Sequence, residues 1–264
     1  MRRLGTAAVM LLLLAAVLWQ WQSHRHAAGT AAAQHGLKIA GGDGGGLPRA
    51  RPAEEKLDET ALSHAVSLAD ASGVAVLLIA RHGHLLLEHY NHDAAADDLL
   101  DGAGMTAAVL ALAGGEAQQL SSRLWQPLNA HDAWLEGCCL RAHYADWLAV
   151  GILLAQDGRF EGAEIAPAAL IAQLRTQGTV LEAGSKASGA EPFAMRDVYY
   201  LHGAQRTRLW VSPALQLVVL QVAGAAGANG WDETQLFNQI VRAVTDRSEA
   251  AAATDLLHQL VPNH

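Results

Sequence analysis

The stretch from Leu124 to Gly162 constrains the fold more than any other part of this 264-residue chain. It reads LWQPLNAHDAW and then, three residues later, CCLRAHYADWLAVGILLAQDGRFEG. Large apolar residues recur there at helical spacing, which predicts a packed helix that stops at Asp157-Gly158. The residues with this spacing are Tyr144, Trp147, Leu148, Gly151, Leu154 and Ala155. We expect Trp125 and Trp134 to anchor the preceding short segment to that helix.

Upstream, the sequence predicts a helix followed by a β-hairpin. Asp58 is placed to cap the helix, which ends before Gly73. Two apolar runs, Val74–Ala80 and Leu85–Tyr90, then flank a short turn that contains glycine, as in a hairpin. The apolar face of the helix is formed by Leu62, Ala65, Val66 and Ala69.

Downstream, the same elements come in the reverse order. The runs Thr207–Val211 and Leu215–Val222 flank a Ser-Pro turn and predict a second hairpin. Asp232 then caps a helix whose buried side carries Leu236, Ile240, Val241 and Val244. This order is expected for an antiparallel sheet that both ends of the chain complete, so we predict an α/β fold with helices flanking the sheet.

These segments resemble the β-lactamase-related serine hydrolases, the group of class C β-lactamases and penicillin-binding proteins, and most closely its aminohexanoate-oligomer hydrolase branch. That branch has a Leu-Trp-x-Pro-Leu-Gly-Ala segment, an Arg-Asp-x-Ala-Arg-Phe-Gly helix and a Gln-Asp-Gly-Arg-Trp-x-Gly loop, whose counterparts here lie within Leu124–Gly162. The resemblance implies a β-lactamase-like sandwich over roughly Leu57 to Val244. Asp146 matches the aspartate of the Arg-Asp pair, but Ala145 replaces the arginine, so we expect that ion pair to be lost.

The chain lacks the nucleophile that the resemblance implies. Such hydrolases use a Ser-x-x-Lys, in which the lysine helps to take the proton of the attacking serine. The three lysines here, Lys38, Lys56 and Lys186, follow His35, Ala53 and Ala183 by three residues, so the motif is absent.

The short interval from Tyr90 to Leu124 cannot hold the family's nucleophile helix, helical insertion and tyrosine motif together, so a reduced helical half is expected. Two alignments remain open. Either Gly104 and Ala107 stand at the serine and lysine positions, or the nucleophile segment is deleted, which we favour slightly.

The family's third motif, a Lys-Thr-Gly or His-x-Gly on the strand beside the cleft, resembles the segment Leu201–Pro213. His202 and Gly203 stand at the motif. The resemblance implies that a side chain there recognises a carboxylate or carbonyl group. His202 and Gly203 are therefore our candidate ligand-binding residues, against the alternative that His202 is an ordinary sheet residue. We assign no catalytic residue.

Thirteen histidines raise the possibility of a metal site. The densest group lies on or beside the first hairpin and comprises His82, His84, His89, His92 and Asp93. Zinc requires three or four converging ligands that a second layer of groups orients. Histidines on an exposed hairpin lack such an enclosure, so we predict no metal site and no cofactor.

The N-terminus predicts membrane insertion. Arg2 and Arg3 precede an apolar run from Leu4 to Leu18, which Trp19 and Trp21 close. This is the pattern of a signal anchor or a cleaved signal peptide over residues 1–22. The resulting expectation is an inner-membrane anchor with the domain in the periplasm, or secretion to the periplasm after cleavage.

The remaining domain boundaries follow from composition. Residues 23–56 are rich in Ala, Gly and His, which predicts a flexible tether. Residues 57–247 form the β-lactamase-related domain, and residues 248–264 form a tail that we expect to be partly helical. The adjacent Cys138 and Cys139 are expected as two unpaired thiols rather than as a vicinal disulfide.

A formal net charge of −8 without any basic cluster argues against a nucleic-acid partner. The leading functional hypothesis is a catalytically inactive relative that binds a peptide-like or cell-wall ligand, or a protein partner. The alternatives are a divergent serine hydrolase acting on amide or ester bonds, with Ser185 beside Lys186 as a candidate, and a decaying gene product.

Overall fold

A computed structural model describes residues 36–91, 94–184, 195–204, 206–224 and 232–247. The chain separates into two compact units, residues 1–37 and 38–264. The predicted membrane segment (1–22) and the C-terminal tail (248–264) lie outside the described residues. Within the described residues, no helix combines the length and apolar character needed to cross a bilayer.

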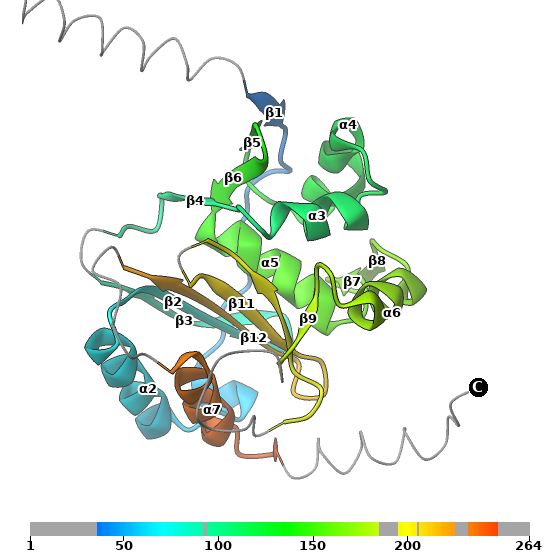
Figure 1. Cartoon of the computed structure of the whole chain (residues 1–264). Coiled ribbons are helices and arrows are strands. Elements are labelled where there is room, and N and C mark those ends of the chain that lie inside the picture. The colour runs from blue at the N-terminus through cyan, green and yellow to red at the C-terminus, as the bar shows by residue number, and fades with distance from the viewer. Residues whose placement is uncertain (1–35, 92–93, 185–194, 205, 225–231, 248–264) are drawn as a thin grey trace, which may run out of the picture. The chain divides into compact units, whose positions relative to one another are not determined.

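An antiparallel sheet of six strands, in the order β3-β2-β12-β11-β10-β9, forms the centre of the domain (Figure 1). Its strands are β2 (Val74–Arg81), β3 (His84–Tyr90), β9 (Glu182–Ala183), β10 (Tyr199–His202), β11 (Arg208–Ser212) and β12 (Leu217–Ala223). Both predicted hairpins are confirmed: β2 pairs with β3, and β11 pairs with β12. The two hairpins join where β2 pairs with β12, so the two ends of the domain complete one sheet.

Helices cover both faces of this sheet (Figure 1). The helices α2 (Glu59–Ala71) and α7 (Glu233–Ala243) pack on one face, and α5 (Tyr144–Ala155) packs on the other. Asp58 and Asp232 accept hydrogen bonds from the backbone N–H groups of Ala61 and Thr234, which confirms both predicted N-caps. The structure therefore bears out an α/β fold with an antiparallel sheet between helices.

The strand β2 is apolar from Val74 to Ala80 because both of its faces are buried. Successive side chains of a strand point to opposite faces. Leu77 and Ile79 join the cluster beneath α2 and α7, whereas Val76 and Leu78 join the cluster beneath α5. On the α5 side, Trp147 packs edge-on against Trp125, with ring centroids 6.3 Å apart, which confirms the predicted anchoring by Trp125.

The segment between the two hairpins builds the rest of the domain. A second sheet has the order β1-β5-β6-β4, and β7 pairs with β8 in a small ribbon. Their strands are β1 (Leu37–Ile39), β4 (Leu99–Asp101), β5 (Ala133–Glu136), β6 (Cys139–His143), β7 (Arg159–Phe160) and β8 (Ala163–Glu164). The helices are α3 (Thr106–Leu112), α4 (Ala117–Leu120) and α6 (Ala168–Gln177), with short helical turns at Pro52–Glu55 and Ser121–Trp125.

Part of the expected tether is packed onto the domain. Gly42 N–H donates to Ala130 O at 2.9 Å, and Gly41 N–H donates to an Asp132 carboxylate oxygen at 3.0 Å. Ile39 is 1% exposed, and the backbone of Arg49 forms an isolated parallel β-bridge with Leu85 of β3. Residues 39–49 therefore contact the domain that we expect from residue 57 onward. This polar segment is held by backbone hydrogen bonds and close glycine contacts rather than by burial of a large apolar surface.

Candidate functional site

The start of α3 lies where one of the two alignments places the nucleophile. Gly104 sits in the turn between β4 and α3 with a φ of +85°, a conformation that residues with a Cβ rarely adopt. A Cβ added to Gly104 would collide with the carbonyl oxygen of His202. Ala107, at the lysine position, is exposed on the first turn of α3. The backbone of β10 thus fills the space that a side chain of residue 104 would need.

His202 is the last residue of β10 and pairs with Arg208 of β11. Its side chain is 53% exposed, and its Nδ1 atom lies 3.8 Å from Oε1 of Glu182 on the adjacent strand. Gly203 donates its N–H to Thr207 O at 2.9 Å, and a Cβ on Gly203 would come within 2.7 Å of the Thr207 Cβ atom. The structure therefore brings the two predicted ligand-binding residues directly against Gly104, with the His202 imidazole open to solvent.

This arrangement bears on the alignment left open by the sequence. The structure places the turn before α3 beside the third-motif strand, as expected if Gly104 and Ala107 occupy the serine and lysine positions. The deletion alignment that we favoured slightly requires no such contact. The proximity of Gly104 to His202 and Gly203 therefore favours the other alignment.

Asp146 has a partner that the sequence did not predict. It is 3% exposed on the first turn of α5, and its Oδ1 atom accepts hydrogen bonds from the His131 backbone N–H at 3.1 Å and from the ring Nδ1 at 3.0 Å. The His131 ring lies edge-on to His143 at 4.8 Å, and its side chain is 40% exposed. Asp146, for which we expected no arginine partner, is thus paired with His131.

The His131–Asp146 pair was missed because no short-range pattern marks it. The two residues lie in separate segments, and they meet only when the Leu124–Trp134 segment folds onto α5. A buried aspartate that orients an accessible imidazole is an arrangement that general bases use. Here no serine hydroxyl is hydrogen-bonded to His131 within the described residues. Ser121 donates to Ala40 O instead.

The histidines of the first hairpin are held by carboxylates. His82 and His84 contact the two oxygens of Glu55 through their Nδ1 atoms, at 2.6 and 2.9 Å, and they line a pocket of about 240 Å³. His89 contacts Asp70 at 2.6 Å. His92 and Asp93 lie outside the described residues. No group of metal-binding geometry occurs in the described part of the chain.

The expected state of the two cysteines is corrected by the structure, which joins Cys138 and Cys139 in a vicinal disulfide. Side chains of adjacent residues usually point in different directions, but the β5–β6 turn brings these two together. Because our expectation rested on the strain of such a ring alone, it did not take the turn into account.

No protein-family model matches the chain, and no curated protein matches it. Among solved structures, it is similar to one from Bacillus anthracis described as a candidate 6-aminohexanoate-dimer hydrolase. The TM-score is 0.52 at 12% identity, over 86% of this chain and 92% of the other. The chain has a β-lactamase-like fold. A candidate β-lactamase from Bacteroides dorei is more distant, with a TM-score of 0.44 at 10% identity over 75% of this chain and 98% of the other.

Proposed function

We propose that this protein is a non-catalytic member of the β-lactamase-related serine hydrolases that binds a peptide-like or cell-wall ligand, or a protein partner. The observation that carries the proposal is the environment of Gly104. The position that the alignment gives to the nucleophile has no side chain, and the carbonyl oxygen of His202 fills the space beside it. The absence of any Ser-x-x-Lys from the sequence supports the same conclusion.

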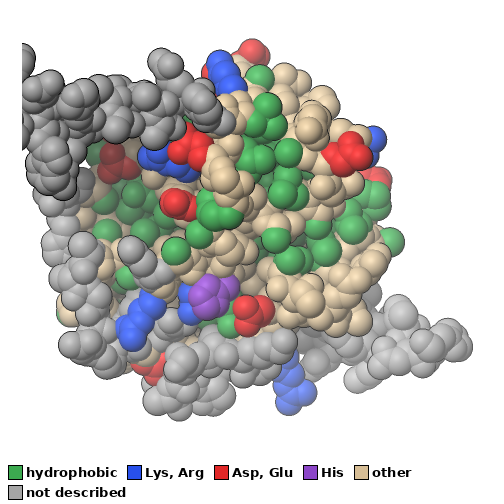
Figure 2. Space-filling view, turned by 45° about the horizontal axis from the view of Figure 1, so that its top comes forward, with side chains coloured by type: hydrophobic (Ala, Val, Ile, Leu, Met, Phe, Trp, Pro, Cys, Tyr) green, Lys and Arg blue, Asp and Glu red, His purple; other side chains and the backbone are tan. Residues whose placement is uncertain are grey.

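The helix α3 buries Thr106, Ala108, Val109 and Leu112 and turns its remaining side chains outward. Ala107 is exposed, and Leu110 and Ala111 are only half-buried. Figure 2 shows hydrophobic side chains in several groups on the side of the domain that it views, with charged side chains scattered between and around them. His202 adds a polar group that can recognise a carboxylate.

Covalent labelling tests the proposal directly. The protein is incubated with a fluorescent β-lactam and with a fluorophosphonate, and its intact mass is then measured. We expect no mass shift from protein that shows a cooperative thermal unfolding transition. A shift that maps to one serine would establish a divergent hydrolase, and loss of labelling in Ser185→Ala would identify the nucleophile. Ser185 itself lies outside the described residues.

A binding role must also be separated from a decaying gene product. The folded protein is titrated with soluble peptidoglycan fragments, and heat is measured by calorimetry. Saturable binding that His202→Ala weakens supports the ligand-binding role, since the substitution removes the exposed imidazole without altering the core. A chain without a cooperative unfolding transition would instead support decay.

The membrane anchor is a further part of the proposal. Its support is the sequence pattern of Arg2, Arg3 and the apolar run Leu4–Leu18. Fractionation of cells expressing the full chain, beside a variant lacking residues 1–22, tests it. We expect the full chain in the inner-membrane fraction and the variant in the soluble fraction. An intact mass that lacks the first residues would show a cleaved signal peptide instead.

A further inference from the structure

The disulfide lies at the tip of a hairpin and joins an exposed residue to a buried one. Glu136 of β5 pairs with Cys139 of β6, so Gly137 and Cys138 form the turn between the strands. Gly137 has a φ of +60°, which glycine adopts without strain. Cys138 is exposed to solvent, whereas Cys139 is 5% exposed.

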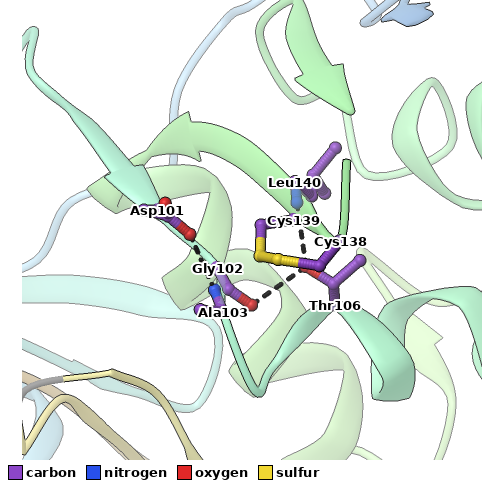
Figure 3. The surroundings of a disulfide bond; sticks show 7 residues. All are labelled: Asp101, Gly102, Ala103, Thr106, Cys138, Cys139 and Leu140. Carbon is purple, nitrogen blue, oxygen red and sulfur yellow. Dashed lines mark hydrogen bonds between the residues drawn. A yellow bond between two sulfur atoms is a disulfide. The ribbon is translucent and has the colours of Figure 1, made fainter. Parts of the chain in front are cut away.

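The residue after the disulfide is tied to the start of α3 (Figure 3). Leu140 N–H donates to the Thr106 hydroxyl at 2.9 Å, and this hydroxyl donates to Gly102 O at 2.9 Å. Gly102 N–H in turn donates to Leu140 O at 2.9 Å. Thr106 is buried, so water does not compete for these hydrogen bonds. The conformation of the cysteine turn is thereby coupled to the backbone that leads into Gly104.

From this geometry we propose that Cys138–Cys139 is a thiol-exchange site for small thiols and dithiols, with Cys138 as the sulfur that is attacked. Exchange requires the incoming thiolate to reach one sulfur along the S–S axis, so access selects the site of attack. The exposed Cys138 is open to that approach, and the buried Cys139 is the leaving group.

The reaction is a balanced exchange. A thiolate attacks the Cys138 Sγ atom, the new S–S bond forms as the Cys138–Cys139 bond breaks, and the electron pair goes to Cys139, which takes a proton from water. With a dithiol, the second thiolate attacks the sulfur of the reagent and releases Cys138. The dithiol is oxidised to its own disulfide, and Cys138 and Cys139 are reduced to two thiols.

Mass spectrometry of the full chain tests the site. Protein purified without reductant is denatured and alkylated with iodoacetamide, and we expect no adduct before reduction and two after it. Native protein is then treated with glutathione and trapped with iodoacetamide. We expect glutathione on Cys138 and the alkyl group on Cys139. Free thiols at the outset, or glutathione on Cys139, would overturn the proposal.

Single variants measure the same asymmetry as a rate. Cys139→Ser leaves Cys138 alone, and Cys138→Ser leaves Cys139 alone. We expect the first variant to react with a chromogenic aromatic disulfide at least about tenfold faster, because access controls the exchange rate. Equal rates in two folded variants would contradict the assignment, and the mapping on the wild-type chain does not depend on either variant folding.

Hydrogen exchange tests the coupling to α3. We expect dithiothreitol to increase amide exchange at Met105 and Thr106 at least about threefold in the wild-type chain, as local opening becomes easier. The matched control is the double variant Cys138→Ser/Cys139→Ser, in which the same reductant should change nothing. Equal exchange of the wild-type chain with and without reductant would overturn the coupling.

Discussion

At the scale of single residues, Gly104 and Asp146 show how contacts with distant segments determine what a position can hold. Gly104 has a left-handed conformation and lies against the carbonyl of His202, so its missing Cβ is required by the packing. Asp146 is buried, and its Oδ1 atom accepts hydrogen bonds from the backbone N–H and the imidazole of His131.

Gly104→Ser is expected to destabilise the domain by more than about 2 kcal/mol, since it adds a collision with His202 to backbone strain. Gly115→Ser is the matched control, because Gly115 has a φ of +90° with nothing within 4 Å of its added Cβ. That control should cost only the conformational strain, about 1–2 kcal/mol. Urea unfolding followed by circular dichroism measures both. Equal losses would show that His202 does not exclude the side chain.

The same geometry argues against restoring catalysis by creating the motif alone. We expect Gly104→Ser/Ala107→Lys, which creates the Ser-x-x-Lys pattern, to remain unlabelled by a fluorescent β-lactam. The reason is that the serine cannot occupy the required position while the His202 carbonyl fills it. Labelling of this double variant at residue 104 would show that β10 moves to accommodate the serine and that catalysis lacked only the two side chains.

Asp146→Ala should lower the free energy of unfolding by about 1–3 kcal/mol, because it empties a buried position and removes the acceptor of two part-buried hydrogen bonds from His131. Asp97→Ala is the control, since Asp97 is exposed and its loss should change stability by less than about 0.5 kcal/mol. Chemical denaturation of both variants gives the comparison. An Asp146 variant as stable as the control would mean that the His131 contact adds nothing to stability.

At the scale of elements, local patterns predicted the helices and hairpins well, but not the docked segment before them. The apolar run of β2 and the cap at Asp58 depend on residues that are close in sequence, so a window of the chain contains the signal. Residues 41–46 are mostly glycine, and their order depends on Asn129, Ala130 and Asp132, which are distant in sequence. Composition alone cannot reveal such partners.

Removal of residues 38–56 is expected to reduce stability strongly. A chain that begins at Leu57 loses the burial of Ile39 and the backbone bonds to Leu85 and Ala130 that a chain beginning at Lys38 retains. The expected difference is at least about 3 kcal/mol. Thermal unfolding of the two chains measures it. Identical midpoints would restore the tether interpretation for this segment.

At the scale of the whole molecule, the sequence predicted the sheet from its two ends but not the contacts that define the candidate site. The hairpins, their order and the flanking helices follow from hydrophobic pattern and turn residues. The contact between Gly104 and His202 joins the middle of the chain to its last part, and the His131–Asp146 pair needs a packed helix. Such contacts depend on the assembled sheet, which no local pattern encodes.

Three buried or half-buried tyrosines predict sensitivity to alkali. Burial raises the pKa of Tyr90, Tyr144 and Tyr199 above the ordinary tyrosine value. In the unfolded chain these phenols ionise near pH ~10, while the folded protein retains their protons. Stability is therefore expected to fall as the pH rises above that value.

Absorbance of tyrosinate at 295 nm, recorded with circular dichroism in the same pH titration, tests this expectation. The titration of these phenols should coincide with loss of structure. Tyr199→Phe removes the hydrogen bond to Leu154 O and should reduce the steepness of the pH dependence. A smooth titration of all four tyrosines in folded protein would contradict the prediction.

The pairing of β2 with β12 also has a consequence for synthesis. The ribosome makes the β2–β3 hairpin early, but β12, the strand that pairs with β2 on its other side, comes near the end of the domain. Until then, the nascent chain carries an apolar strand with one open edge. Contacts between distant segments form slowly and leave such surfaces exposed. A product released before β12 is complete would lack the strand that pairs with β2, and its central sheet would keep an open apolar edge.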